Sequence, residues 1–238
     1  MKNLSLLSVL CILALLLSPS VKLYADSPLQ RVAGNDRYQT ATQISQKGWP
    51  DKSAYVIIAT GQNFADALCA APLSQKYNCP ILLNIKENLL SSTKKEIQRL
   101  EAKNAVIIGG TGAISENVEK ELKATGLSCT RISGEDRFDT SAKIAEKLDF
   151  NGEVCVATGL NFPDAISISS IATQKGMPVL LTMTYKCPQS VKDYIKNKNI
   201  TAAYIVGSDD VVSDGVAGNF PHVKRLQGND IAMIPIWL

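Results

Sequence analysis

The chain has 238 residues, a formal net charge of +3 and a single histidine, His222. So small a net charge excludes the broad positive field of a nucleic-acid-binding protein, so that any anionic partner must meet local clusters of basic residues. The lone histidine excludes the usual zinc sites and a Ser-His-Asp triad. Six cysteines without a CxxC spacing are typical of single buried thiols, with a disulfide or metal framework as the alternative.

The chain begins with the pattern of a secretory signal peptide over residues 1–25. Lys2 precedes an apolar run from Leu4 to Leu17, and Pro19 follows the run. The run is shorter than the roughly 20 residues of a membrane span, and no later run is long enough. We therefore expect cleavage after Ala25 and a mature chain without a membrane partner; an uncleaved anchor is the alternative.

Three related segments indicate that the rest of the chain is internally repeated. RVAGNDRYQTATQIS begins at Arg31, RISGEDRFDTSAKIA begins at Arg131, and RLQGND begins at Arg225. A repeat of about 100 residues is too long for one turn of a solenoid and has the size of a small domain. We predict a first repeat over residues 26–130, a second over residues 131–224, and an aborted third over residues 225–238.

Hydrophobic patterning predicts alternating helices and strands in each repeat. In the first repeat, helical spacing is found after Asp36 and over residues 65–76, 91–100 and 115–125. Short apolar runs, typical of strands buried on both faces, occupy residues 54–59, 80–83 and 105–109, with a further short strand at 129–133. The matching runs of the second repeat are residues 153–157, 178–181 and 203–207. This alternation predicts an α/β fold in which helices cover a mostly parallel sheet.

The first repeated motif is RxxGxDR[YF]xT[AS]. Its glycine allows a turn, and Asp36 and Asp136 are predicted to cap the helices that follow. Its arginines, which can pair bidentately with a carboxylate or a phosphate, are Arg31, Arg37, Arg131 and Arg137. They are therefore either structural salt bridges or direct ligand contacts, and the residues alone leave both roles open.

The second motif, ATGxNFxDA, begins at Ala59 and again at Ala157. It follows a strand and opens a helix, which is where α/β proteins usually bind ligands. Its loop has one glycine instead of a nucleotide-binding fingerprint, and Asp66 and Asp164 at the helix start would repel a phosphate. We predict that these two aspartates are helix caps.

The third motif, IIGGTGAIS from Ile107, reads IVGSDDVVS from Ile205 in the second repeat. Because the second copy adds negative charge, the motif is predicted to be a turn and helix cap, not a cofactor site. Asp209 and Asp210 are adjacent, so their side chains diverge and do not form the DxD pair of a metal-dependent phosphoryl site. We therefore predict no catalytic, cofactor or metal site.

These motifs and their order closely resemble the clostridial type 2 cell-wall-binding repeat, found in S-layer-associated surface proteins and beside wall hydrolases of the amidase type. The resemblance covers about residues 31–230 and rests on RVAGNDRYQTA, ATGQNFADA, PILL and VIIGGTGAIS with their second copies. It implies tandem Rossmann- or Toprim-like units, typically three around a pseudo-threefold axis. It also implies a non-catalytic anchor to an anionic polysaccharide in the wall of a Gram-positive bacterium.

The resemblance also links an Ile-Leu-Leu element to polymer attachment. This element is Ile81, Leu82 and Leu83 in the first repeat, and Val179, Leu180 and Leu181 in the second. By composition it is a buried strand that positions the loop touching the polymer. These residues and the four arginines of the first motif are the candidate polymer-binding or supporting residues.

The chain departs from the family pattern after Asp230, where Ile231 and Ala232 replace an arginine and an aromatic residue. We expect a truncated third repeat, and self-association through the apolar face that the missing unit leaves. The sequence thus predicts a secreted wall-binding module whose weak sites gain avidity by repetition. The alternatives are a wall-lytic amidase component, a phosphate-handling α/β enzyme, or an inactive truncated product.

Overall fold

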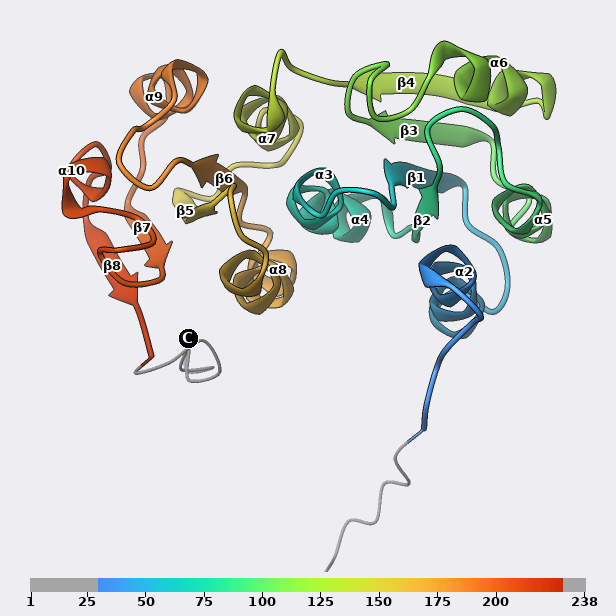
Figure 1. Ribbon diagram of the computed structural model, residues 1–238, viewed down its shortest axis with the longest axis horizontal. Helices are drawn as coiled ribbons and strands as arrows, with labels where there is room; N and C mark the ends of the chain where they lie inside the picture. Colours follow the sequence, from blue (N-terminus) through green and yellow to red (C-terminus); the bar gives the residue numbers. More distant parts are fainter. Residues whose placement is uncertain (1–29, 229–238) are drawn as a thin grey trace, which may run out of the picture. The chain divides into compact units, whose positions relative to one another are not determined.

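The computed structural model describes residues 30–228, and its compact body begins at Val32. Helices and strands alternate through the body and form two four-stranded sheets in which every strand pair is parallel (Figure 1). The predicted α/β fold with two tandem units is therefore confirmed. The predicted signal peptide and residues 229–238 of the predicted third repeat lie outside the described residues.

The first sheet has the strand order β2-β1-β3-β4. Its strands are β1 (Tyr55–Thr60), β2 (Ile81–Asn84), β3 (Asn104–Ile108) and β4 (Ser128–Ile132). Arg131 lies on β4, opposite Ile107 of β3. Arg131, which opens the second copy of the first motif, therefore belongs to the last strand of the first sheet. We propose that the boundary between the repeats follows Ile132.

The second sheet repeats this order as β6-β5-β7-β8. Its strands are β5 (Glu153–Thr158), β6 (Val179–Thr182), β7 (Ala202–Val206) and β8 (Val223–Leu226). Arg225 lies on β8, opposite Ile205, as Arg131 lies opposite Ile107. The segment that begins the third copy of the motif therefore completes the second sheet.

The helices connect the strands in the order that the sequence predicts, with one difference. The first repeat contains α2 (Arg37–Gly48), α3 (Ala65–Cys69), α4 (Ala71–Tyr77), α5 (Ser91–Arg99) and α6 (Glu116–Ala124). The second contains α7 (Arg137–Ala145), α8 (Pro163–Lys175), α9 (Gln189–Lys196) and α10 (Asp214–Ala217). The single helix expected over residues 65–76 is broken at Ala70, because Pro72 has no amide hydrogen to continue the helical bonding. Ser170 stands at the matching position of the uninterrupted α8.

Strand side chains alternate between two apolar clusters, which explains why the strand sequences are apolar throughout. Val56 and Ile58 of β1 pack with residues of α5 and α6, whereas Ile57 and Ala59 face the opposite side of the sheet. On that side they belong to a cluster that also contains Cys155 and other residues of the second sheet. The two repeats therefore share one hydrophobic core.

The repeats contact each other partly through equivalent helices and partly through different surfaces. The first repeat contributes α3 and α4, and the second contributes α7, α8 and β6 (Figure 1). The elements of the first repeat that correspond to α7 and β6 are α2 and β2. The contacts of α3 with α7 and β6 therefore join non-equivalent elements, whereas the contacts of α3 and α4 with α8 join equivalent helices.

Candidate functional site

The three repeated motifs meet at the carboxyl end of the first sheet. The loop after β1, the glycine turn after β3 and the segment that leads from β4 into α7 line a cavity of about 440 Å³, here called the junction hollow. The first two segments belong to the first repeat, and the third begins the second repeat. This site therefore needs two consecutive repeats, and it lies where α/β sheets usually bind ligands.

Short side chains shape the loop after β1. The hydroxyl of Thr60 accepts a hydrogen bond from the amide of Gln62 at 3.2 Å, and Oδ1 of Asn63 accepts from the amide of Ala65 at 3.2 Å. The side chain of Gln62 is exposed at the hollow. Asn63 thus provides a hydrogen-bond acceptor for the backbone amide at the start of α3, a role that its sequence position alone did not predict.

The prediction that Asp66 and Asp164 cap their helices is wrong. The cap positions of α3 and α8 are Phe64 and Phe162, and neither makes a side-chain cap hydrogen bond. Each aspartate lies inside the first helical turn, past the cap position. By contrast, Asp36 accepts from the amide of Gln39, and Asp136 accepts from the amides of two residues that follow it.

The carboxylate of Asp66 lies against the glycine turn. A Cβ atom on Gly109 would lie 2.5 Å from Oδ2 of Asp66, and Gly109 has a φ of +96°. Gly207 repeats this arrangement with Asp164, at 3.0 Å and a φ of +102°. The second and third motifs are therefore coupled, since the glycine of one makes room for the carboxylate of the other. Burial raises the pKa of Asp66, and the charge of Arg137 partly offsets the rise.

Arg131 has a structural environment inside the first repeat. Its Nη1 atom donates to the carbonyl oxygens of Gly109 at 2.8 Å and Ile114 at 2.9 Å. Nε and Nη2 both donate to Glu119 of α6, at 3.1 and 2.8 Å. Arg225 makes the same two carbonyl contacts in the second repeat and pairs with Asp214. These contacts fix the glycine turn to the last strand of its own sheet.

The other arginines of the motif are differently placed. Nη1 of Arg37 donates to the carbonyl oxygen of Gly61 at 2.6 Å, and Nη1 of Arg137 donates to that of Gly159 at 2.6 Å. Arg137 also lines the junction hollow. Arg31 is exposed. A contact between any of these arginines and a wall polymer stays a prediction.

The Ile-Leu-Leu element is largely buried. Leu82, Leu180 and Leu181 are fully buried, and Val179 is almost so. Ile81 and Leu83 are half-buried. The buried members are placed to support the fold, whereas Leu83 reaches a second cavity.

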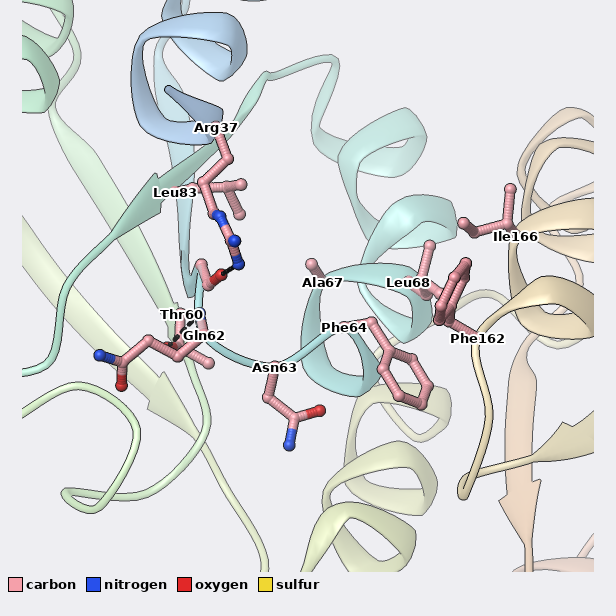
Figure 2. A pocket seen from close by; sticks show the side chains of 11 residues that line it. Arg37, Thr60, Gln62, Asn63, Phe64, Ala67, Leu68, Leu83, Phe162 and Ile166 are labelled. Carbon is pink, nitrogen blue, oxygen red and sulfur yellow. Dashed lines mark hydrogen bonds between the residues drawn. The ribbon is translucent and has the colours of Figure 1, made fainter. Parts of the chain in front are cut away.

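A second cavity of about 560 Å³, here called the outer hollow, is shown in Figure 2 and shares Thr60, Gln62 and Asn63 of the loop after β1 with the junction hollow. Arg37 and Leu83 line it from the first repeat, and Phe162, which directly precedes α8, and Ile166 of α8 line it from the second. The rings of Phe64 and Phe162 meet edge to face with their centroids 6.1 Å apart. The outer hollow is lined mainly by apolar side chains together with Arg37 and the amides of the loop after β1, whereas carboxylates, amides and glycine backbone line the junction hollow.

Within residues 30–228, no group of three or more histidine, cysteine or acidic residues is arranged to hold a metal ion. None of the helices in this part of the chain has the length and apolar character needed to cross a membrane.

A family model described as Cell wall binding domain 2 (CWB2) matches residues 31–119 and 131–217. The chain belongs to the cell wall binding domain 2 family. It is thus a cell wall binding module, which places it at the cell wall or cell surface. The two matched segments are the two repeats whose motifs meet at the junction hollow.

Relatives of this CWB2 chain include an amidase and an amidase enhancer. It is 33% identical to N-acetylmuramoyl-L-alanine amidase LytC of Bacillus subtilis over 93% of this chain and 44% of that protein. It is 36% identical to the Amidase enhancer of the same species over 83% of this chain and 27% of that protein. The solved structure of Cwp6 from Clostridium difficile matches with a TM-score of 0.80 and 32% identity, over 86% of this chain and 34% of that one. The chain therefore spans less than half the length of each of these relatives.

Proposed function

We propose that the chain is a secreted, non-catalytic module that anchors to an anionic cell-wall polysaccharide of a Gram-positive bacterium, and that the junction hollow is its polymer site. The observation that carries this proposal is the convergence of all three repeated motifs on one polar cavity. A site built between repeats gives a physical reason for keeping the motifs in tandem.

The lining of the junction hollow suits a hydroxyl-rich polymer. Gln62 and Asn63 supply amide donors and acceptors, and Asp66 and Glu135 supply carboxylates that accept hydrogen bonds from sugar hydroxyls. Arg137, the one cation among the described residues that line the hollow, is available to an anionic group of the polymer. We infer weak binding per junction, strengthened when several chains or repeats engage one polymer.

A second candidate role is that of an accessory to a wall amidase. The likeness to the Amidase enhancer favours this role. It is compatible with polymer binding, because a wall anchor can hold a partner enzyme near its substrate. The similarity to the amidase is no evidence that this chain is catalytic, because the chain spans only 44% of that protein.

A wall-pelleting assay tests the proposal. The chain should sediment with purified walls and remain in solution with walls stripped of their anionic polymer. Gln62→Ala should weaken sedimentation by roughly three- to tenfold, because one or two hydrogen bonds to the polymer are lost. Gln98→Ala, which changes an exposed glutamine of α5, is the matched control and should bind like the wild type. Full retention on stripped walls contradicts the proposal.

We further propose that the chain self-associates, through the face that the outer hollow borders.

A further inference from the structure

A third cavity, of about 450 Å³, lies between α7 and α9 of the second repeat and is here called the acidic hollow. The charged residues that line it are Glu135, Asp136, Asp139, Glu146, Asp193 and Lys143. Lys143 pairs with Asp139 at 3.1 Å. Over residues 30–228, none of the other carboxylates takes part in an ion pair. The hollow therefore has an excess of negative charge that no ion pair in the described part of the chain neutralises.

The packing of the two helices does not require these acids. The matching cavity of the first repeat, of about 400 Å³, lies between α2 and α5. At three positions that line both cavities, the first repeat has a neutral or basic residue and the second has an acid: Gln39 and Asp139, Gln46 and Glu146, Lys95 and Asp193. The same helix pair thus forms without the acids, so their presence in the second repeat points to a ligand.

Tyr194 provides an independent indication of a ligand. It lines the hollow from α9 and is 3% exposed, yet within residues 30–228 its hydroxyl has no hydrogen-bond partner. Burial raises the pKa of Tyr194 to about 12, with a smaller contribution from the charge of Glu146, so the hydroxyl is neutral and its oxygen is able to accept a hydrogen bond. Lys198 lies over the ring, with Nζ 5.6 Å from its centroid, and is not among the residues that line the hollow. A buried hydroxyl without a partner costs free energy, which a ligand that bonds to it would offset.

The lining of the hollow indicates the chemistry of this ligand. The acidic residues over residues 30–228 are not arranged to hold a metal ion, so an organic cation fits better. An ammonium group donates up to three hydrogen bonds, which suits Glu146, Asp193 and the hydroxyl oxygen of Tyr194. Ser190 and Asn197 also line the hollow and can bond to hydroxyl groups. The ligand should therefore combine one ammonium group with several hydroxyls.

We propose that the acidic hollow binds an amino sugar, whose ammonium group donates to Glu146, Asp193 and the hydroxyl oxygen of Tyr194. The acidic hollow and the junction hollow share Glu135 and Asp136. An amino sugar in the acidic hollow is therefore placed to belong to a polymer whose other units occupy the junction hollow. Only this link to the polymer rests on the proposed function; binding of the free amino sugar does not.

Titration of the ¹⁵N-labelled chain with D-glucosamine, followed by nuclear magnetic resonance, tests the proposal. At low salt and slightly acidic pH, amide signals of α7 and α9 should shift with a dissociation constant in the millimolar range, because exposed ion pairs are weak. N-Acetylglucosamine, which keeps the ring but lacks the ammonium group, should bind roughly tenfold more weakly. Lysine amide, which has the ammonium group without the sugar hydroxyls, should also bind more weakly than glucosamine.

Variants separate the role of the hollow from a loss of folding. Asp193→Lys introduces the residue of the first repeat at an exposed position and should weaken glucosamine binding by roughly tenfold. Tyr194→Phe should weaken it by roughly three- to tenfold without lowering the melting temperature, because the fold makes no hydrogen bond to this hydroxyl. Glu116→Gln, at an exposed position of α6, is the matched control and should bind like the wild type. Gln62→Ala should also bind glucosamine like the wild type, since Gln62 lines the junction hollow and not the acidic one.

Three results would overturn the proposal. The first is a wild-type chain that binds N-acetylglucosamine as tightly as glucosamine, or binds neither. The second is lysine amide that binds as tightly as glucosamine, which would indicate a basic peptide instead of a sugar. The third is a Tyr194→Phe variant that binds glucosamine like the wild type. None of these results bears on wall sedimentation through the junction hollow, so the two proposals fail separately.

Discussion

Glu96 shows how one buried carboxylate joins two helices. It is 2% exposed on α5, and it accepts hydrogen bonds from Ser45 at 2.6 Å and Gln46 at 3.1 Å, both on α2. Arg99 donates to both of its oxygens, at 3.0 and 2.7 Å. Burial alone would raise the pKa of Glu96, but the hydrogen bonds from Arg99, Ser45 and Gln46 outweigh it and hold the pKa below the ordinary value.

Glu96→Gln should lower the free energy of unfolding by about 2 kcal/mol at neutral pH, because it leaves the guanidinium of Arg99 without its counter-charge. Since the folded pKa lies below the unfolded one, this contribution is present above the unfolded pKa and is lost as the pH falls through the folded value. Urea unfolding at neutral and acid pH measures both effects, with Glu116→Gln as an exposed control. Equal stability of Glu96→Gln and wild type at neutral pH would contradict the assignment.

Asp66 and the glycine turn leave no room for a side chain at Gly109. Gly109→Ala should cost about 1 to 3 kcal/mol, since alanine at a φ of +96° is strained and its Cβ atom meets Asp66. Gly110→Ala is the control, because nothing lies within 4 Å of the added Cβ atom. Thermal unfolding of the two variants should separate them clearly; equal melting temperatures would show that the turn adapts.

At the scale of elements, α2 packs on α5 in the first repeat and α7 packs on α9 in the second. These two equivalent contacts are made by different kinds of side chain. The position of Glu96 in α5 is occupied in α9 by Tyr194, which is 3% exposed and meets Phe150 edge to face. Burial, and to a lesser extent the charge of Glu146, raises the pKa of Tyr194 to about 12. Among the described residues, its hydroxyl has no hydrogen-bond partner.

Tyr194→Phe should therefore leave stability unchanged or raise it by about 1 kcal/mol, because it removes a buried hydroxyl that makes no hydrogen bond. Tyr204→Phe is the matched comparison. The hydroxyl of Tyr204 donates to Glu153 at 2.9 Å, so its removal should lower stability. Chemical unfolding of the two variants measures the contrast, and a destabilised Tyr194→Phe would reveal an interaction of that hydroxyl.

Strand β2 contains the Ile-Leu-Leu element of the first repeat. Variants of this strand can distinguish a structural role from a contact with the polymer. Leu82→Ala should cost about 3 kcal/mol, because Leu82 is fully buried beneath α5 and its loss leaves a cavity. Leu83→Ala, at a half-buried position, should cost less. Urea unfolding gives the two values. Wall binding that is lost in Leu82→Ala while stability is retained would assign Leu82 a direct role instead.

At the scale of the whole molecule, the core shared by the two sheets predicts that both repeats unfold together. Cys79 of the first repeat and Cys155 of the second belong to this core, and burial raises the pKa of each thiol to about 12. Both should therefore resist alkylation in the folded chain.

Alkylation at increasing urea concentration, read residue by residue by mass spectrometry, should label Cys79 and Cys155 at the same midpoint. The half-buried Cys129 should react earlier and serves as the control for reagent activity. Separate midpoints for Cys79 and Cys155 would mean that the repeats unfold independently.

The sequence by itself determined the features that depend on neighbours along the chain. Apolar runs, helical spacing and repeated motifs predict the α/β units, and the order of the motifs predicts the family. The prediction that Asp66 caps α3 considered only its position at the start of the helix. It is wrong because the carboxylate of Asp66 lies against Gly109 and does not cap α3.

Only the tertiary structure decided how the motifs combine. The arginines of one motif separate, so that Arg131 completes the first sheet while Arg137 enters the second repeat and faces Asp66. The junction hollow arises in the same way, from residues of different repeats. Such contacts depend on the packing of one repeat against the next, and no periodicity within a single segment records that packing.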